Sequence, residues 1–464
     1  MKSALQSGLY WWNTWQERSV NRRIFAAMVT VGSLTGLVKL VAMVKEMVVA
    51  RQFGTSDALD AYLIAFLLPQ FAINLIGGSL NASLIPTYIQ VREQEGERAA
   101  RRLLSSVMVL AVGLFVALAV VLALTASSVL PLIASGFAPE KLALANAMYY
   151  VLLLTLVLSG LVTTGSSILN AENRFALVAV VPMATSIATV LVVIVMAKHW
   201  GSFALVGGTV GGAVIEMGLV GWGLARAGVS LVPRWGGISP AVKQVARQYA
   251  PMVAGAFLMG SGGLISQSLA AMLSPGSVSA LAYGNKVTSL LLGIGAMAVS
   301  TAVLPHFSRM VARKDWLGLR HSLLTYSRLI LMVMFPVTFV LIYYSEPVVA
   351  MLFQRGVFTE ADTQLVGRVQ AMLLLQVPLY AVGMLFVGLI SAFKANHLML
   401  WGSAINLFVC TVLSYVLMQR FEIVGIAMAT SAMYVTSVAF LWLVSMRLMR
   451  KMWINVPGEK RTGA

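Results

Sequence analysis

The chain has 464 residues, of which 59% are hydrophobic and only 11% are charged. This composition excludes an ordinary soluble domain and a disordered chain, and it is typical of a polytopic helical membrane protein. The net charge of +17 does not indicate nucleic acid, because the basic residues gather in alternate loops. The single cysteine, Cys410, excludes an intrachain disulfide and a Cys-based metal site, and we expect no cofactor.

Long apolar runs follow one another from about residue 24 to residue 446. Runs of this length predict an all-α polytopic protein with about twelve transmembrane helices. The spans are expected near residues 24–46, 58–88, 103–133, 142–169, 175–197, 202–225, 248–273, 278–308, 323–345, 364–392, 398–418 and 423–446.

The loops on one predicted side of the membrane hold most of the lysines and arginines, as in 92–102 and 309–320. The positive-inside rule places that side, together with both chain ends, in the cytoplasm. The first apolar span has no small-residue cleavage site behind it, so we expect a retained helix rather than a signal peptide.

The chain divides into five predicted segments. Residues 1–23 are expected to form a cytoplasmic segment, either an interfacial helix or an unstructured tail. Residues 24–226 form a six-helix N-lobe and 248–446 a six-helix C-lobe, joined by a cytoplasmic linker, 227–247, that carries two prolines and several glycines. Residues 447–464 form a cytoplasmic tail.

The two predicted lobes resemble an internal repeat. At a constant offset, SLNASLIPTYIQV (79–91) falls on AVSTAVLPHFSRM (298–310), so that Pro86 meets Pro305 and Tyr88 meets Phe307. Six spans separate the copies, so both lobes have the same orientation and are related by a pseudo-two-fold axis along the membrane normal. This arrangement predicts a central cavity between the lobes.

Three lysines lie inside predicted spans: Lys39 and Lys45 in the first span, and Lys286 in the second span of the C-lobe. An intramembrane charge costs roughly 2.5–3.5 kcal/mol, so these side chains need a wet cavity or partners. Lys39 and Lys45 are separated by about 9 Å of helical rise and can line one broad wall. Lysines in such a cleft attract an anion, and a pyrophosphate is a good match.

Acidic residues near these lysines have two interpretations. Glu46 and Asp60 can neutralise a lysine when substrate is absent, or the charges pair only to lock helices together.

Glu216 stands alone in the sixth span and is a candidate for carrying a coupling proton or cation, with a polar packing contact as the alternative. The small residues of GGTVGGA (207–213) permit close helix approach.

Several segments resemble the MurJ (MviN) lipid II flippases of the multidrug/oligosaccharidyl-lipid/polysaccharide exporter superfamily. They include VVARQFGTSDALDAYLIAFLLP, SLIP, GFAPE, ILNAENRF and SALAYGNKVTSLLLGIGAMAVSTAVLPHFSRM. The resemblance implies a fold and an activity. Members of this family move undecaprenyl-pyrophosphate-linked disaccharide-pentapeptide to the outer leaflet by alternating access, and their cationic cavity is thought to hold the pyrophosphate.

The resemblance also implies site residues. The family's first-helix arginines fall on Lys39 and Lys45, and the acidic neighbour falls on Glu46. The aspartate of the TDAF-like segment falls on Asp60, and the arginine of the YADR-like segment falls on Lys286. Lysine keeps the charge at these positions but lacks the planar fork that binds phosphate in two places.

The sequence departs from the family pattern at further positions. Ile73 or Asn74 stands where a cavity arginine is expected, and Asn285 stands where the YADR-like segment has its acid. Family members usually add two helices that are thought to form a groove for the lipid tail, whereas this sequence ends after the twelfth predicted span. These departures concern the substrate more than the fold.

The predicted function is therefore a flippase for a lipid II-like, polyprenyl-pyrophosphate-linked saccharide. The main alternative is a flippase for an exopolysaccharide or O-antigen repeat unit. A multidrug or cation antiporter of the same superfamily fits less well, because its cavity is expected to be acidic or aromatic. A membrane glycosyltransferase would need clustered acids, which are not seen. We expect a monomer that works with membrane lipids and with glycosyltransferases or polymerases.

Overall fold

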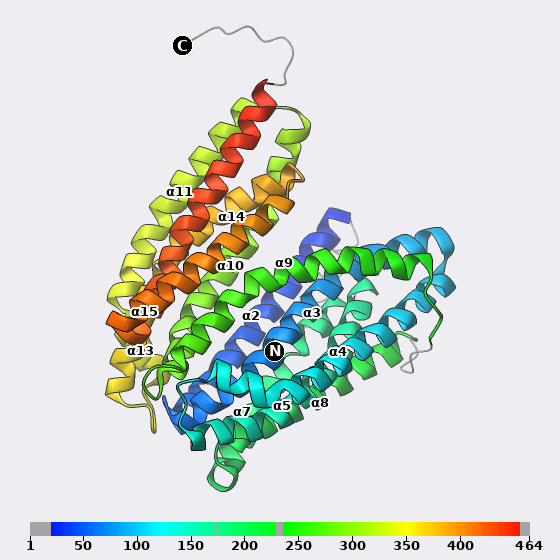
Figure 1. Cartoon of the computed structure of the whole chain (residues 1–464). Coiled ribbons are helices and arrows are strands. Elements are labelled where there is room, and N and C mark those ends of the chain that lie inside the picture. Colours follow the sequence, from blue (N-terminus) through cyan, green and yellow to red (C-terminus); the bar gives the residue numbers. More distant parts are fainter. Residues whose placement is uncertain (1–19, 173, 229–234, 455–464) are drawn as a thin grey trace, which may run out of the picture. The chain divides into compact units, whose positions relative to one another are not determined.

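The computed structural model describes residues 20–172, 174–228 and 235–454, which form helices and no strand (Figure 1). The helices are α2 (Val20–Phe53), α3 (Asp57–Glu95), α4 (Glu97–Ile133), α5 (Pro139–Ala171), α6 (Phe175–Val180), α7 (Met183–Trp200), α8 (Phe203–Arg226), α9 (Pro240–Ala270), α10 (Ser277–Ala312), α11 (Trp316–Tyr343), α12 (Ser345–Phe353), α13 (Glu360–Leu374), α14 (Gln376–Ala392) and α15 (His397–Ile454). The predicted all-α class is confirmed.

Each predicted span falls on one or more of these helices. Span 175–197 covers α6 and α7, and span 364–392 covers α13 and α14. The last two spans share α15, which breaks at Glu422, where φ is 50°. Counting α6 with α7 and α13 with α14, nine helices among the described residues are long and apolar enough to cross a membrane.

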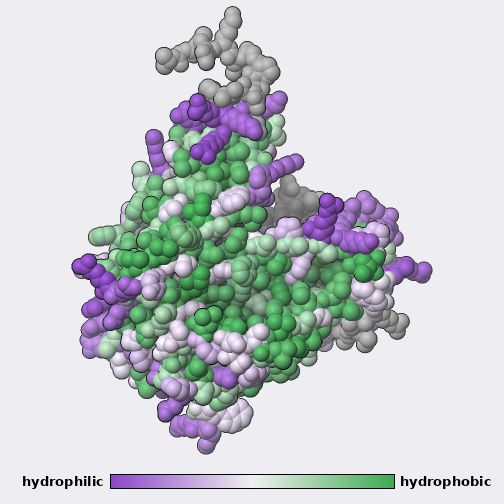
Figure 2. Space-filling model, in the orientation of Figure 1, coloured by the Kyte–Doolittle hydropathy of each residue, from purple (hydrophilic) through white to green (hydrophobic). Residues whose placement is uncertain are grey.

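The surface of these helices is apolar where a soluble protein would be polar. Leu124, Met259 and Phe339 are 77%, 76% and 72% exposed. Figure 2 shows hydrophobic side chains over much of the face in view, while hydrophilic side chains gather at helix ends, including the C-terminal end of α15. Exposed apolar surface on this scale is expected for helices that face lipid.

The described residues group into two compact units. Unit 1 comprises the described residues within Met1–Val49, Ala72–Thr125 and Met148–Pro251. Unit 2 comprises the described residues within Ala50–Phe71, Ala126–Ala147 and Met252–Ala464. The division into lobes at 227–247 stays a prediction.

Three predicted segments, the N-terminal segment, the linker and the tail, lie partly outside the described residues. Residues 1–19 of the N-terminal segment and 455–464 of the tail are outside them, as are residues 229–234 of the linker. Within the linker, α9 has already begun at Pro240.

Unit 1 is built around a core to which five helices contribute. Leu84 and Tyr88 of α3 pack with Leu104 of α4, Leu169 of α5 and Leu224 of α8, and Val242 and Val245 of α9 complete the cluster. Tyr88 is 2% exposed, and Phe307, its predicted counterpart in the repeat, is fully buried in unit 2. Both residues therefore serve as core aromatics.

Two hydrophobic clusters lie among the described residues of unit 2. One joins α3, α10, α13 and α15 through Ile64, Leu281, Leu373 and Ile426. The other joins α10, α11, α14 and α15 and contains Phe307. Residues 50–71 and 126–147 therefore pack onto elements that follow residue 252.

Helices α7 and α8 approach closely because glycines face threonines. A Cβ added at Gly208 would lie 2.5 Å from Cα of Thr189, and one at Gly212 would lie 2.4 Å from Cα of Thr185. Both distances end on backbone atoms, which cannot move aside without shifting the helix. The prediction that GGTVGGA permits close approach is confirmed for these two glycines.

We expect Gly212→Ala to destabilise the fold by about 1–3 kcal/mol, because the added methyl overpacks the α7–α8 contact. The measurement is the thermal unfolding midpoint of the detergent-purified protein. Gly211→Ala is the matched control, since its Cβ would meet no atom within 4 Å. Equal midpoints for the two variants would contradict the packing argument.

Candidate functional site

Helix α2 places Lys39 and Lys45 in unit 1, and the two lysines have different surroundings. Lys39 is exposed, whereas Lys45 is half-buried and its Nζ lies 2.9 Å from Oε1 of Glu46. The Lys45 and Glu46 side chains are 27% and 14% exposed. Glu46 thus pairs with a lysine that is its own neighbour in the chain, and the role of this pair when substrate is absent stays a prediction.

The remaining predicted cavity residues lie on α3 and α10. Asn74, on α3 in unit 1, is exposed. Asn285 and Lys286 lie on α10 in unit 2, where Asn285 is exposed and Lys286 is half-buried. A joint site of Lys39, Lys45 and Lys286 stays a prediction, since the lysines belong to different units.

Asp60 occupies a fully built polar site inside unit 2. Its side chain is 1% exposed. One carboxylate oxygen accepts a hydrogen bond from the backbone N–H of Gly276, and the other accepts one from Ser279, both at 2.8 Å. These are the orphan donors at the start of α10, where the helix dipole also favours a negative charge. Asp60 therefore caps a helix that is distant in sequence.

Lys141, on α5, completes this site. Its Nζ lies 2.9 Å from the Asp60 carboxylate, pairs also with Asp57, and sits 4.1 Å from the centroid of the Phe137 ring. The Lys141 side chain is 11% exposed, whereas Asp57 is 56% exposed. Lysine and helix terminus together compensate the buried carboxylate, which would otherwise be costly to desolvate.

The geometry of Gly276 is part of the same contact. Its φ is +85°, and a Cβ there would lie 2.5 Å from the carbonyl oxygen of Thr55. Only glycine meets both conditions, the left-handed backbone and the close approach of another chain segment. The turn before α3 is therefore pressed against the start of α10.

The same turn also contacts the segment that leads into α13. The backbone N–H of Val357 donates to the carbonyl oxygen of Arg51 at 3.0 Å, and the Thr55 hydroxyl donates to the Asp362 carboxylate. Asp362 belongs to the capping box of α13 with Thr359. Residues 51–60 thus touch the N-terminal ends of both α10 and α13.

Sequence reasoning found Asp60 but not Lys141, Thr55 or Asp362. Lys141 follows the GFAPE segment directly, on the predicted side of the membrane that carries few basic residues. Its isolation on that side, opposite Asp57 and Asp60, was the available signal. No local pattern indicated that Thr55 and Asp362, 307 residues apart, would meet.

Glu216 is half-buried on α8 and accepts a hydrogen bond from the Thr185 hydroxyl of α7 at 2.7 Å. This hydrogen bond is a polar packing contact, the alternative to ion coupling that the sequence left open for Glu216. Its role in ion coupling stays a prediction.

A second polar group lies in unit 1, which sequence reasoning did not identify. The Tyr88 hydroxyl lies 2.5 Å from Oε1 of Glu172, and Arg92 approaches the same oxygen at 4.0 Å. Glu172 belongs to the ILNAENRF segment (168–175), which begins in the last turn of α5. The group links the end of α5 to α3.

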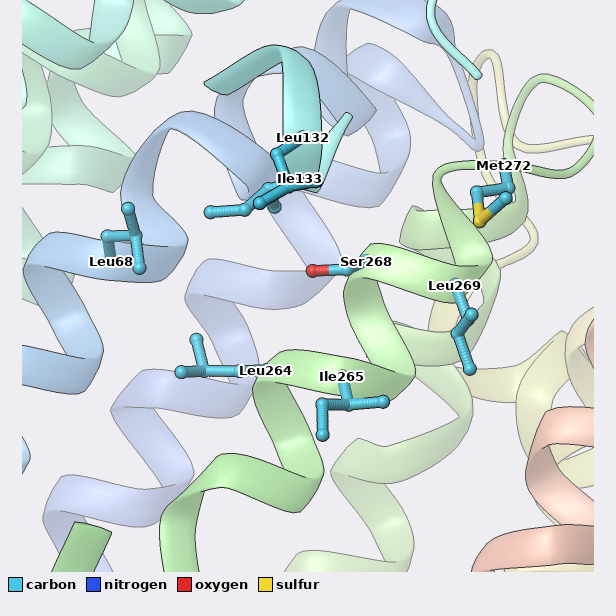
Figure 3. A pocket seen from close by; sticks show the side chains of 8 residues that line it. All are labelled: Leu68, Leu132, Ile133, Leu264, Ile265, Ser268, Leu269 and Met272. Carbon is cyan, nitrogen blue, oxygen red and sulfur yellow. The ribbon is translucent and has the colours of Figure 1, made fainter. Parts of the chain in front are cut away.

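An apolar pocket of about 230 Å³ lies between α3, α4 and α9 in unit 2 (Figure 3). Its lining residues are Leu68, Leu132, Ile133, Leu264, Ile265, Ser268, Leu269 and Met272. The Ser268 hydroxyl is the one polar side-chain group in view. A pyrophosphate needs cations, so this pocket does not suit that headgroup.

The described part of the chain shows no candidate metal-binding site. Residues 20–172, 174–228 and 235–454 contain no group of three or more His, Cys, Asp or Glu side chains placed to hold a metal ion.

The chain is similar to known proteins over most of its length. Residues 49–456 match the family model described as lipid II flippase MurJ. A probable lipid II flippase MurJ from Synechocystis is 28% identical over 449 residues, covering 91% of this chain and 81% of the relative. A lipid II flippase MurJ from Burkholderia cenocepacia is 25% identical and covers 75% and 69% of the two chains.

Solved structures share the fold. A lipid II flippase MurJ in an inward closed conformation matches with a TM-score of 0.78 at 20% identity, covering 92% of this chain and 90% of that one. An inward-facing multidrug resistance transporter of the MATE family in the MOP superfamily matches with a TM-score of 0.76 at 12% identity, covering 92% and 99%. The family resemblance of the sequence is confirmed: this chain belongs to the lipid II flippase MurJ family, whose members are membrane transporters and not enzymes.

Proposed function

We propose that this chain is an alternating-access flippase that moves an undecaprenyl-pyrophosphate-linked saccharide of the lipid II type from the cytoplasmic to the outer leaflet. The observation that carries the proposal is the family match over residues 49–456. MurJ flippases are multi-pass inner-membrane proteins, and the apolar helices of this chain fit the same location. The proposal also places both termini in the cytoplasm. It further includes that the protein works as a monomer beside glycosyltransferases or polymerases.

Lys39, Lys45 and Lys286 are proposed to bind the pyrophosphate, with Asn74 and Asn285 supporting them. Point charges on flexible stems attract a pyrophosphate without fixing its orientation. The Lys45–Glu46 pair supports a site that is charge-balanced when empty, because Glu46 can release Lys45 to an arriving anion. Such an exchange costs less than exposing an unpaired lysine in a low-dielectric cavity.

Asp60 is proposed to close the outer side of the protein. In the predicted lobes, Asp60 and Lys141 belong to the N-lobe, whereas Gly276 and Ser279 belong to the C-lobe. Alternating access requires contacts between lobes that form and break as one side opens. When the cap on α10 is released, Lys141 stays on the same lobe as Asp60, so the carboxylate keeps a partner in both states.

We expect Asp60→Asn to open the outer side more often. Asparagine has one acceptor oxygen for the two backbone N–H donors and loses the ion pair with Lys141. A hydrogen bond to a charged group contributes roughly 1.5–3 kcal/mol, so the equilibrium shifts on the order of tenfold to a hundredfold.

The measurement is the labelling rate of Ser279→Cys by a membrane-impermeant thiol reagent, in a Cys410→Ser background. Ser279 is fully buried, so labelling reports opening. Asp57→Asn is the control, because Asp57 is exposed and does not touch α10 in the contacts described above; its effect should be small. An unchanged rate in Asp60→Asn would contradict the gate.

Replacing Lys39, Lys45 or Lys286 by Ala should each reduce lipid II translocation in proteoliposomes at least tenfold, because each change removes a charge that binds the pyrophosphate. Arginine at the same positions should preserve transport. Lys198→Ala, at the exposed end of α7, is the control. Full activity of all three alanine variants, at normal expression, would overturn the assignment of the binding site.

Depletion of the protein distinguishes the lipid II substrate from its alternative. In a strain without another flippase, we expect lipid II to accumulate and the cells to lyse, measured by quantifying lipid-linked intermediates. Normal growth with loss of capsule or slime would instead favour an exopolysaccharide or O-antigen unit, an alternative favoured by Ile73 and by the replacement of arginine by lysine.

A further inference from the structure

A second, larger groove lies in unit 2 between α11, α14 and α15. It encloses about 400 Å³ and is lined by apolar side chains, among them Leu324, Phe386, Ala439 and Trp442. Leu324, Ala439 and Trp442 are exposed, so the groove is open along the side of the helices. Exposed apolar concavity on a membrane-spanning helix faces lipid chains.

One hydroxyl in this groove lacks a partner within the described part of the chain. The Ser327 Oγ is buried and makes no hydrogen bond there. Other serines in neighbouring helices bond the carbonyl four residues back, as Ser261 does with Phe257 and Ser403 with Met399. A buried donor without an acceptor is costly, so a ligand oxygen at this point would be stabilised.

Both walls of the groove lead toward an arginine at the same end. On α11, Arg320 lies four residues before Leu324 and seven before Ser327, which puts all three on one face. On α15, Arg450 lies four residues after Met446, which also lines the groove. Arg320 and Arg450 are exposed, and their neighbours Leu319 and Met449 share one hydrophobic cluster.

The spacing along the helix fits the layers of a lipid leaflet. Ser327 and Arg320 are separated by about 10 Å of helical rise. The interfacial layer of a bilayer is roughly 5–8 Å thick, and an arginine side chain extends toward the headgroups from below. Ser327 therefore lies at the depth of the ester groups when the arginines lie at the depth of the phosphates.

We propose that this groove binds one anionic phospholipid of the cytoplasmic leaflet. An acyl chain lies along Leu324, Phe386 and Trp442. The phosphate lies at Arg320 and Arg450, and an ester carbonyl accepts the hydrogen bond of Ser327. Asp315, the acid closest to Arg320 in the sequence, accepts a hydrogen bond from the Gly318 backbone N–H at 2.9 Å, while Arg320 and Arg450 supply two cations. This surplus of cations favours an anionic over a zwitterionic headgroup.

The test uses Trp442 as the reporter in the full-length protein reconstituted in nanodiscs. The lipids are brominated phosphatidylglycerol and brominated phosphatidylcholine, whose bromine atoms quench nearby tryptophan. The chain has 10 tryptophans, so the Trp442 signal is the difference between wild type and Trp442→Phe. We expect quenching by phosphatidylglycerol to saturate at a mole fraction roughly tenfold lower than quenching by phosphatidylcholine.

The variants separate a specific site from general solvation by lipid. Arg320→Gln with Arg450→Gln should abolish the preference, Ser327→Ala should weaken binding several-fold, and Ala439→Phe should block the groove. Arg101→Gln is the control, because Arg101 is exposed on α4 and pairs with Glu97. Size-exclusion profiles identify any variant that fails to fold. If the arginine or Ala439 variants fail, the effect of Ser327→Ala, the mildest change, decides whether the groove is a specific lipid site.

Three results would overturn the proposal. Equal quenching by the two lipids would show general solvation only. A preference that survives loss of both arginines would remove the assigned headgroup site. Displacement of brominated phosphatidylglycerol by undecaprenyl pyrophosphate at a much lower mole fraction than by unlabelled phosphatidylglycerol would make the groove a site for the substrate's polyprenyl chain.

Discussion

The structure of unit 2 depends on one buried carboxylate, that of Asp60. It receives two backbone N–H groups from the start of α10 and the ammonium of Lys141. A carboxylate that is 1% exposed would be strongly disfavoured without this compensation. Because these partners come from segments far apart in sequence, one side chain holds the starts of α3, α5 and α10 together. The glycine at position 276 is required by the same contact.

The charges on α2 follow a different principle. Lys45 and Glu46 are adjacent and half-buried, and they compensate one another locally. This ion pair lies within one helix, and its exchange with an arriving anion is the basis of the proposed binding site. The contrast separates the two chemical tasks of a flippase: fixed charge–dipole contacts suit a gate, and exchangeable ion pairs suit a binding site.

The two apolar cavities of unit 2 also differ in their chemistry. The pocket between α3, α4 and α9 is apolar with one hydroxyl, whereas the groove between α11, α14 and α15 leads toward arginines at one end. Of these two cavities, the groove is the one that we propose to combine an apolar wall with cations at its rim. That combination matches an amphipathic lipid, because a chain and a headgroup need both.

The sequence by itself determined the class, the helices and the family. Apolar runs long enough to span a bilayer leave few alternatives to helices, and each predicted span falls on one or more helices of the structure. It also singled out Asp60 as a candidate site residue, through the motif around it. The tertiary structure alone decided which partners that acid has. Lys141, Gly276 and Ser279 approach Asp60 only after α5 and α10 have packed, and no local pattern encodes a contact between residues 216 positions apart.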